Sequence, residues 1–289
     1  MTLRYVTPLR YPGGKAKLTK FVRAVLHKNA LRDADYVEPY AGGAAIGLSL
    51  LINGDVARIH INDLDRSVHA FWYSVLNSTE QLCRRISSAK LSIDEWHRQR
   101  WIQKHKDEVS LLDLGFSTFF LNRTNRSGII SSGGVIGGVE QTGRWKLDAR
   151  FSREALIARV EAIVAYRQQI VLYNHDAALL LPVLLKKLPA TSLLYLDPPY
   201  YKKGTRRLYA NTYTHADHVK VAEILHGARR PWLVSYDDVQ EVRALYRQHR
   251  YRRYRLAYTA RVRHEGEEII FFSDELMLPK VQNPLTVLR

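Results

Sequence analysis

The chain has 289 residues, of which 46% are hydrophobic and 25% are charged, a balance typical of a folded protein and not of a disordered one. Its single cysteine, Cys83, excludes an internal disulfide and a cysteine zinc site. No apolar run approaches the roughly 18–20 residues that span a bilayer. The first residues also lack the apolar segment of a secretory signal, so the sequence predicts a cytoplasmic protein.

The formal net charge of +16 predicts a polyanionic partner, either nucleic acid or an anionic membrane. Residues 201–263 hold fifteen Lys and Arg but five Asp and Glu, so most of the net charge falls in about a fifth of the chain. Tyrosines alternate with arginines there, as in Tyr251-Arg252-Arg253-Tyr254-Arg255. This mixture suits phosphate contacts and base stacking better than a membrane helix, which needs an apolar face. Nucleic acid is therefore the expected partner.

Helical and strand patterns alternate in the first 75 residues and again from residue 166 onward. In the first part we predict, in order, helix 15–28, a short strand ending at 38, helix 44–52, strand 58–62 and a helix from 66. In the second part we predict strand 169–173, a helix from 176, strand 192–196, helix 216–228, strand 231–235, a helix from 239, and strands 251–258 and 268–272. This order predicts an α/β fold, a mainly parallel sheet with helices on both faces. The last two strands are expected to form an antiparallel edge hairpin.

Residues 76–165 follow a different pattern. Helical periodicity dominates, over 80–90, 94–104, 111–122 and 152–166. Between the last two lies the Gly/Ser-rich segment 127–139, which has no helical pattern and is expected to form a loop or hairpin. We therefore predict a mainly helical domain, 76–165, inserted into a sheet domain made of residues 1–75 and 166–289.

The sequence Asp197-Pro198-Pro199-Tyr200 directly follows the apolar run 192–196. In open α/β sheets ligands bind beyond the carboxyl ends of the strands, so this tetrapeptide lies where chemistry is expected. Its prolines fix φ and lack N–H donors, which makes a stiff turn with a free carbonyl. A carboxylate, a carbonyl and an aromatic ring on such a turn suit a planar base that carries an amine. The competing interpretation is a chance turn without function.

A second segment, Tyr36-Val-Glu38-Pro39-Tyr40-Ala-Gly42-Gly43-Ala44, joins a strand end, a glycine turn and a helix start. Glycines there allow positive φ and close approach of a ligand to the backbone. The spacing is not that of a dinucleotide site, which disfavours a pyrophosphate. Asp63 follows the next strand, where an acidic residue binds ribose hydroxyls, and Asp65 is a weaker candidate for that role.

A third segment, Arg10-Tyr11-Pro12-Gly13-Gly14-Lys15, places two glycines and a lysine before a helix. A lysine is unfavourable near the positive end of the helix dipole, which suggests that this one has another function. The segment would make a small pocket for an anion or a carboxylate.

These segments, in this order, resemble the motifs of the Dam-like DNA adenine-N6 methyltransferases. The matching residues are Tyr11-Pro-Gly-Gly-Lys15, Glu38-Pro-Tyr-Ala-Gly-Gly-Ala44, Asn62-Asp63 and Asp197-Pro-Pro-Tyr200, with further similarity at Asn122-Arg123, Arg126-Ser-Gly128 and Asn174-His-Asp176. The resemblance covers nearly the whole chain. Two positions depart from the family pattern. Tyr40 replaces the usual Phe, and Ala44 stands where a third glycine is common, which adds a methyl group near the cofactor.

The resemblance implies a Rossmann-like methyltransferase sheet, an inserted target-recognition domain and S-adenosyl-L-methionine as cofactor, with no metal. Lys15 would pair with the cofactor's carboxylate, Asp63 would accept hydrogen bonds from its ribose, and Asp176 would lie near its adenine. The implied cofactor-binding residues are Tyr11, Lys15, Glu38, Pro39, Tyr40, Gly42, Gly43, Asp63, Asp176 and Asp197.

The resemblance also implies the catalytic residues, which are Asp197, Pro198, Pro199 and Tyr200. The carboxylate and the Pro198 carbonyl would accept N–H bonds from the exocyclic amine of adenine, which localises its lone pair for attack on the sulfonium methyl group. Tyr200 would stack on the base, and the base must leave the duplex because N6 is used in pairing.

The expected partner is double-stranded DNA, since Arg and Asn side chains read guanine and adenine edges and basic loops contact phosphates. The expected DNA-binding residues are Arg10, Asn122, Arg123, Asn125 and Arg126, and, in the basic loop after the catalytic turn, Lys202, Lys203, Arg206, Arg207, Tyr209 and Asn211. A cognate restriction enzyme for the same site is a candidate partner. We expect a monomer or a weak dimer, with no membrane contact.

Other functions fit parts of this pattern. The same tetrapeptide can hold the amine of cytosine-N4 or of an adenine in RNA. A protein glutamine methyltransferase would carry Asn at position 197 and is disfavoured. A non-catalytic DNA-binding protein on the same fold would also fit the charge. His215, Asp217 and His218 imitate metal ligands, but their spacing fits a helix start better.

Overall fold

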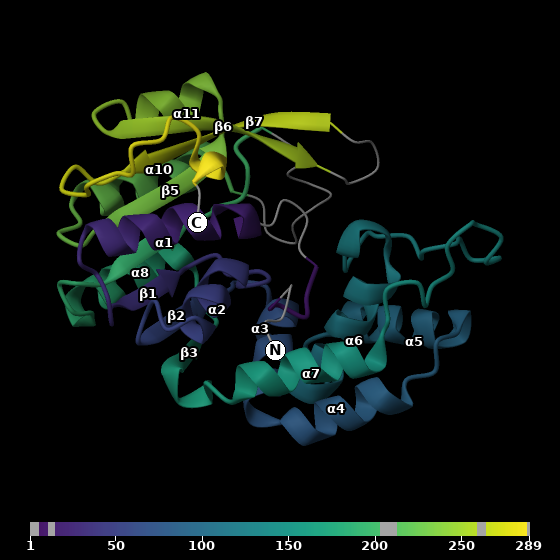
Figure 1. Ribbon diagram of the computed structural model, residues 1–289. Coiled ribbons are helices and arrows are strands. Elements are labelled where there is room, and N and C mark those ends of the chain that lie inside the picture. The colour runs from purple at the N-terminus through teal and green to yellow at the C-terminus, as the bar shows by residue number, and fades with distance from the viewer. Residues whose placement is uncertain (1–5, 11–14, 203–212, 259–263, 288–289) are drawn as a thin grey trace. The chain divides into compact units, whose positions relative to one another are not determined.

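The structure is a computed structural model that describes residues 6–10, 15–202, 213–258 and 264–287. The chain divides into two compact units (Figure 1). One, the helical unit, comprises Met1–Gly14, Asp65–Arg167 and Thr259–Val262. The other, the sheet unit, comprises Lys15–Leu64, Gln168–Tyr258 and Arg263–Arg289.

The sheet unit contains a seven-stranded sheet in the order β3-β2-β1-β4-β5-β7-β6. The strands are β1 (Asp35–Glu38), β2 (Arg58–Asn62), β3 (Ile170–Tyr173), β4 (Leu193–Leu196), β5 (Trp232–Asp237), β6 (Arg250–Tyr258) and β7 (His264–Phe272). The first five pair in parallel, whereas β7 is antiparallel to both β5 and β6. The predicted α/β fold and the antiparallel edge hairpin are confirmed. β7 begins four residues before the predicted start at 268, because it stays paired with β6 beyond the end of β5.

Helices cover both faces of this sheet. They are α1 (Thr19–Lys28), preceded by the short 3-10 helix η1 (Lys15–Leu18), then α2 (Ala45–Ile52), α8 (Ala177–Lys187), α10 (His215–His226) and α11 (Gln240–Leu245). Side chains of α8, α10 and α11 share one apolar cluster with Leu194, Val234 and Phe271. Neighbouring strand residues point to the opposite face, where Phe272 contacts Phe21 of α1 with ring centroids 5.9 Å apart.

The helical unit contains α3 (Arg66–Asn77), α4 (Thr79–Ser88), α5 (Ile93–Lys104), α6 (Leu111–Thr124) and α7 (Arg153–Val164). α3 packs against α6: Phe71 stacks on Phe119 at 6.0 Å, and Thr118 Oγ1 donates to the Ser67 carbonyl at 3.0 Å. The main segment of the helical unit therefore begins at Asp65 and includes α3, whereas the sequence pattern placed this helix in the sheet domain and the boundary at residue 75. Periodicity alone does not show which partner buries the apolar face of a helix.

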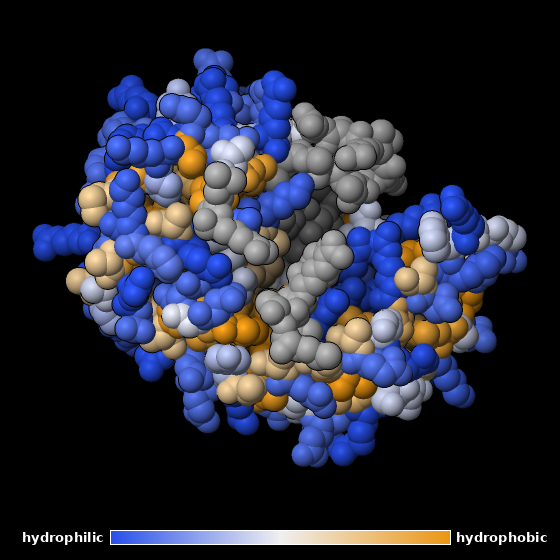
Figure 2. Space-filling view, viewed as in Figure 1, coloured by the Kyte–Doolittle hydropathy of each residue, from blue (hydrophilic) through white to orange (hydrophobic). Residues whose placement is uncertain are grey.

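The described helices include none that is both long enough and apolar enough to cross a membrane. The face shown in Figure 2 is largely hydrophilic, with hydrophobic residues in small groups.

A glycine in α6 allows the close approach of α3. A Cβ atom on Gly115 would lie 2.3 Å from Ser74 Oγ and 2.5 Å from the Ala70 carbonyl oxygen. We predict that Gly115→Ala lowers the free energy of unfolding by about 2 kcal/mol, because the helix backbone cannot easily move away. Urea unfolding measures this change. Gly134→Ala is the matched control, since nothing lies within 4 Å of the position that a Cβ atom would take there; equal stabilities of the two variants would contradict the packing described.

Candidate active site

The carboxyl ends of five parallel strands meet at one edge of the sheet, and nearly all the predicted chemistry follows them. In spatial order, the segments that follow or end these strands are 174–176, 62–63, 39–43, 197–200 and, at the end of β5, Asp237. Chain order reverses between β1 and β4, which are neighbours in the sheet. Ligands bind at such switch points in open α/β sheets.

Lys15 is buried beside the Asp-Pro-Pro-Tyr turn. Its Nζ atom lies 3.0 Å from Asp197 Oδ1 and 3.2 Å from the Tyr200 hydroxyl, and 5.0 Å from the centre of the Tyr200 ring. Burial opposes its charge, but the nearby Asp197, Tyr200 and Glu268 outweigh burial and raise the pKa of Lys15 well above its usual value. Lys15 is therefore a permanent ammonium ion. The sequence suggested that Lys15 pairs with the cofactor's carboxylate, whereas the structure pairs it with the carboxylate of Asp197.

Two residues of β5 support the turn and were missed in the sequence. Ser235 Oγ donates to Asp197 Oδ1 at 2.9 Å, and the Tyr195 hydroxyl contacts Ser235 Oγ at 2.8 Å. The buried Asp237 carboxylate accepts the backbone N–H groups of Tyr201 at 2.8 Å and Lys202 at 3.0 Å. Asp237 thereby fixes the chain that leaves the turn. The available signal was their position at the end of the predicted strand 231–235.

The glycine turn after β1 is closed by two carboxylates. Glu38 Oε1 accepts from the Gly47 N–H at 2.9 Å, and Asp63 Oδ2 accepts from the Gly42 N–H at 3.0 Å. Gly42 has φ 46°, a conformation that glycine adopts without strain. Ala44 has the same positive φ, at the start of α2, and its methyl group is buried. The departure from the family's third glycine is therefore a strained backbone position.

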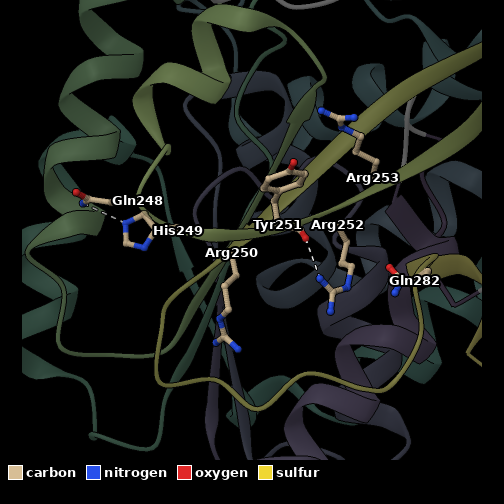
Figure 3. A pocket seen from close by; sticks show the side chains of 7 residues that line it. All are labelled: Gln248, His249, Arg250, Tyr251, Arg252, Arg253 and Gln282. Atoms are coloured by element: carbon tan, nitrogen blue, oxygen red, sulfur yellow. Dashed lines mark hydrogen bonds between the residues drawn. The ribbon is translucent and has the colours of Figure 1, made fainter.

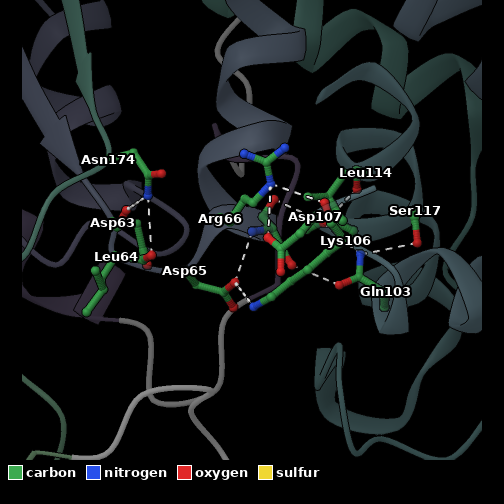
Figure 4. A network of polar contacts seen from close by, with 12 residues as sticks. Asp63, Leu64, Asp65, Arg66, Gln103, Lys106, Asp107, Leu114, Ser117 and Asn174 are labelled. Carbon is green, nitrogen blue, oxygen red and sulfur yellow. Dashed lines mark hydrogen bonds and ion pairs between the residues drawn. The ribbon is translucent and has the colours of Figure 1, made fainter. Parts of the chain in front are cut away.

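Amide side chains hold the neighbouring strand ends together. Asn62 donates to the carbonyls of Pro39 and His175, each at 2.9 Å, and accepts the His175 N–H at 2.9 Å. Asn174 Nδ2 donates to the Asp63 carbonyl at 2.7 Å (Figure 4). Asp176 Oδ1 caps α8 by accepting from Ala178 N at 2.9 Å. These bonds fix the positions of Asp63 and Asp176 at adjacent strand ends.

Asp65, the weaker candidate for a ribose contact, has a structural role within the helical unit. Its carboxylate accepts the Ser67 N–H at 2.9 Å and caps α3, and Lys106 Nζ lies 4.0 Å away (Figure 4). Asp63 is thus the acidic residue at the end of β2 that stays a candidate.

Aromatic side chains gather near the same edge. The hydroxyls of Tyr40 and Tyr213 are 3.0 Å apart, and the rings of Tyr213 and His218 lie 5.4 Å apart. Burial raises the pKa of Tyr213 to about 12 and that of Tyr40 well above its usual value, so both hydroxyls stay protonated. His218 is buried against Tyr236, and Asp217 belongs to a capping box with Thr214. The helix start that the sequence favoured over a set of metal ligands is therefore present, with Asp217 in its cap, whereas His218 packs in the interior.

The predicted DNA contacts from the end of α6 need correction. Asn122, Arg123 and Asn125 are all buried within the helical unit. Asn122 accepts the Arg10 N–H and donates to the Arg10 carbonyl, Arg123 donates to the Pro8 carbonyl, and Asn125 accepts from the Trp96 indole at 2.7 Å. Their side chains are already used in internal hydrogen bonds, so they position backbone and do not face solvent.

The other predicted DNA contacts are partly visible. Arg126 and Lys202 are exposed, and Arg10 is half-buried. Lys202 pairs with Glu241 at 2.7 Å. Five of the predicted DNA contacts lie outside the described part of the chain, namely Lys203, Arg206, Arg207, Tyr209 and Asn211, as does Tyr11, which was predicted to bind the cofactor.

A surface pocket lies on the edge strand β6 (Figure 3). It is lined by Gln248, His249, Arg250, Tyr251, Arg252, Arg253 and Gln282. Arg250 starts β6 and pairs with Phe272, which pairs with Leu233 near the start of β5, so the pocket lies toward the amino ends of the parallel strands. Arg250 also donates to the carbonyls of Asp274 and Leu276. This pocket is remote from Asp197 along the strands and is not the candidate active site.

Comparison with known proteins identifies a family. The family model described as D12 class N6 adenine-specific DNA methyltransferase matches residues 11–262. A curated relative, the Type II methyltransferase M.MjaIII of Methanocaldococcus jannaschii, is 27% identical over 108 residues, and the match spans 35% of this chain and 37% of the relative.

Two solved structures show weak overall similarity. A SAM dependent methyltransferase from Agrobacterium tumefaciens gives a TM-score of 0.39 at 9% identity, over 89% of this chain and 62% of that chain. The rRNA methyltransferase aviRa from Streptomyces viridochromogenes gives 0.38 at 12% identity, over 91% and 85%.

The buried Glu38 provides a pH test of this site. Burial raises the pKa of Glu38 from 4.5 to about 7, so its proton is held more tightly in the folded chain than in the unfolded chain. Glu38 therefore adds stability below about pH 4.5 that is lost as the pH rises through about 7. We predict that Glu38→Gln, which keeps an acceptor for the Gly47 N–H, removes on the order of 3 kcal/mol of this pH dependence.

Urea unfolding between pH 5 and 8 measures the effect. The exposed Glu267→Gln should keep the wild-type pH dependence. Parallel stability curves for wild type and Glu38→Gln would show that Glu38 does not titrate in this way.

Proposed function

Because the chain belongs to the D12 class N6 adenine-specific DNA methyltransferase family, we propose that it transfers a methyl group from S-adenosyl-L-methionine to N6 of adenine in double-stranded DNA. The observation that carries this proposal is the placement of Asp197 on a proline turn at the switch point of the sheet. Its carboxylate is held by Lys15 and Ser235, and its side chain is 25% exposed. A rigid and accessible acceptor is what an amine nucleophile requires.

The residues at the sheet edge fit a nucleoside cofactor with a positive charge. Asp63 and Asp176 follow the ends of neighbouring strands; burial raises the pKa of Tyr213, and the charges of these two carboxylates raise it further, which supports a position near the tyrosine pair Tyr40–Tyr213. Carboxylates at strand ends accept hydrogen bonds from ribose hydroxyls, and aromatic rings pack on adenine. Bound here, the cofactor supplies an electrophilic methyl group on a sulfonium. We assign Glu38, Pro39, Gly42 and Gly43 to the turn beneath it.

The protein groups act on the amine. Among the described residues, both Lys15 and Ser235 contact Oδ1 of Asp197, so Oδ2 is the oxygen that would accept the N6 hydrogen. The Pro198 carbonyl would accept the second. These bonds orient the nitrogen lone pair toward the methyl group, and rate enhancement comes from positioning and electrostatics. The target base would have to be flipped out of the duplex, since N6 is otherwise paired.

Tyr200 keeps its predicted role of stacking on the base only with a further requirement. It is 4% exposed, and its ring faces the Lys15 ammonium. The base would have to meet the ring from the side away from Lys15.

DNA recognition is assigned to the helical unit, through the loop between α6 and α7. An antiparallel bridge joins Asn125 to Val135 at its base. Beyond the bridge, Trp145 is 64% exposed and the Arg144 guanidinium lies 5.5 Å from its ring. Arg126, Lys146 and Arg150 are exposed as well. Cations beside an exposed aromatic ring suit contacts to phosphates and bases.

One reaction separates this function from its alternatives. Purified protein is incubated with methyl-labelled S-adenosyl-L-methionine and either unmethylated duplex DNA or RNA, and the digested product is analysed for modified bases. N6-methyladenine in DNA is expected. N4-methylcytosine or methylated RNA would replace the proposed substrate, and DNA binding without transfer would favour a non-catalytic protein. The cognate restriction enzyme and the monomeric or weakly dimeric state stay predictions.

The carboxylate of Asp197 can be tested directly. We predict that Asp197→Asn lowers kcat by more than roughly 10²-fold, because a carboxamide is a weaker acceptor and cannot balance the positive charge that develops on N6. The affinity for S-adenosyl-L-methionine should also fall, because the lost charge faces the sulfonium, but by less than kcat. The control is Asp274→Asn, at an exposed position. Near-normal turnover of Asp197→Asn would reject the assigned role.

The DNA-binding role of the α6–α7 loop has a salt signature. We predict that the double substitution Arg144→Ala, Lys146→Ala weakens DNA binding. The negative slope of log affinity against log salt should become less steep by about 2, because each side chain neutralises about one phosphate. Fluorescence anisotropy at several salt concentrations measures the slope. Arg84→Ala, on the exposed face of α4, is the control. An unchanged slope would place the phosphate contacts elsewhere.

A further inference from the structure

A second carboxylate lies behind the catalytic ion pair. Glu268 Oε2 is 3.5 Å from Lys15 Nζ, on the same ammonium that lies 3.0 Å from Asp197 Oδ1. The side chains of Lys15 and Glu268 are 3% and 0% exposed, whereas that of Asp197 is 25% exposed. The side chain of Glu268 is therefore shielded from solvent, and Lys15 lies within ion-pair distance of both carboxylates.

The fold fixes Glu268 in this place. In the register of the sheet, Glu268 of β7 lies opposite Asp237 of β5 on one side and Tyr254 of β6 on the other. Strand alternation puts Glu268 on the same face as Phe272, which packs on α1, directly after the η1 turn that carries Lys15. Both neighbouring strands thus hold the Glu268 backbone, and its side chain reaches Lys15 over 253 positions of sequence.

A buried glutamate at such a place needs a physical reason. Lys15 and Asp197 alone would form a neutral pair, and desolvation makes each added buried charge unfavourable. Glu268 gives the three residues Lys15, Asp197 and Glu268 a net charge of −1. Methyl transfer moves a positive charge: the methyl–sulfur bond breaks and leaves a neutral thioether, the methyl–nitrogen bond forms, and N6 carries the charge until it releases a proton to water. A neutral Lys15–Asp197 pair would give that charge no net attraction at either of its positions, whereas the three residues together attract it.

We propose that Glu268 is a positioning residue of the methyl-transfer site, whose carboxylate neutralises Lys15 so that Asp197 keeps its negative charge for the cofactor's sulfonium and the target amine. This inference rests on the proposed function. It also explains why Lys15 can hold Asp197 Oδ1 without cancelling the acceptor strength of the carboxylate. Lys15 fixes the orientation of the Asp197 carboxylate, and Glu268 keeps the net charge of the three residues negative.

The proposal predicts a selective effect on charged ligands. S-adenosyl-L-methionine and its product S-adenosyl-L-homocysteine differ by one methyl group and by the sulfonium charge. Glu268→Gln keeps the size of the side chain and removes its charge. It should weaken the binding of S-adenosyl-L-methionine by about tenfold, as expected for one charge lost within several ångströms in a partly buried site. The binding of S-adenosyl-L-homocysteine should weaken by less than about twofold. Calorimetric titration of both ligands, without DNA, measures the ratio of the two dissociation constants.

Three further variants separate charge from structure. Glu268→Asp keeps the charge and should keep the wild-type ratio, even where its turnover is lower. Lys15→Met combined with Glu268→Gln restores a net charge of −1 and should bring the ratio back toward wild type. Glu267→Gln removes an exposed charge from the adjacent position of β7, on the opposite face of the strand, and should change neither affinity.

The outcomes distinguish the two levels of the account. Wild-type protein that binds neither ligand, or that does not methylate DNA, would overturn the proposed function. If the wild-type protein is active and Glu268→Gln has the same ratio of dissociation constants as wild type, the role of Glu268 is overturned. If Glu268→Gln does not fold, Glu268→Asp provides the test. A change in its ratio of dissociation constants as large as the change predicted for loss of the charge would also overturn the role of Glu268.

Discussion

A buried ammonium ion must be paired, and in this chain that requirement joins Lys15 to Asp197 across 182 positions of sequence. The pair connects the start of the first helix with the turn after β4. It therefore fixes the orientation of Asp197 before any ligand binds. Ser235 contacts the same carboxylate oxygen, and Asp237 holds the backbone just after the turn. Among the described residues, the printed contacts hold Oδ1, so Oδ2 would be the acceptor in the proposed reaction and Asp197 would be preorganised for it.

Preorganisation at this edge depends on the parallel sheet. Five strands bring their carboxyl ends together, and short polar side chains hold the segments that follow them. Asn62 connects the ends of β1, β2 and β3 through three hydrogen bonds, and Asp63 closes the glycine turn through Gly42. The same residues that would contact a cofactor thus also stabilise the turns. A substitution there affects both stability and binding, which is why the tests separate ligand ratios from overall stability.

The sequence predicted the strands and helices well, because hydrophobic periodicity and glycine turns are local signals. It located Asp197, Asp63 and Glu38 at strand ends for the same reason. It did not predict Glu268, since the antiparallel pairing that brings β7 beside Lys15 joins distant parts of the chain. It also misassigned Asn122 and Asn125, because polarity suggested exposure and the structure buries both in internal hydrogen bonds. Local patterns show what a residue can do, whereas tertiary contacts decide what it does.

In the proposed reaction Asp197, held through Oδ1, presents Oδ2 to a flipped adenine. A crystal structure of the protein with duplex DNA and a non-reactive cofactor analogue tests this most directly. We expect an extrahelical adenine whose N6 lies about 3 Å from Asp197 Oδ2 and from the Pro198 carbonyl oxygen. An adenine that stays stacked in the duplex, or an N6 atom bound by other groups while Asp197 contacts protein residues alone, would contradict it.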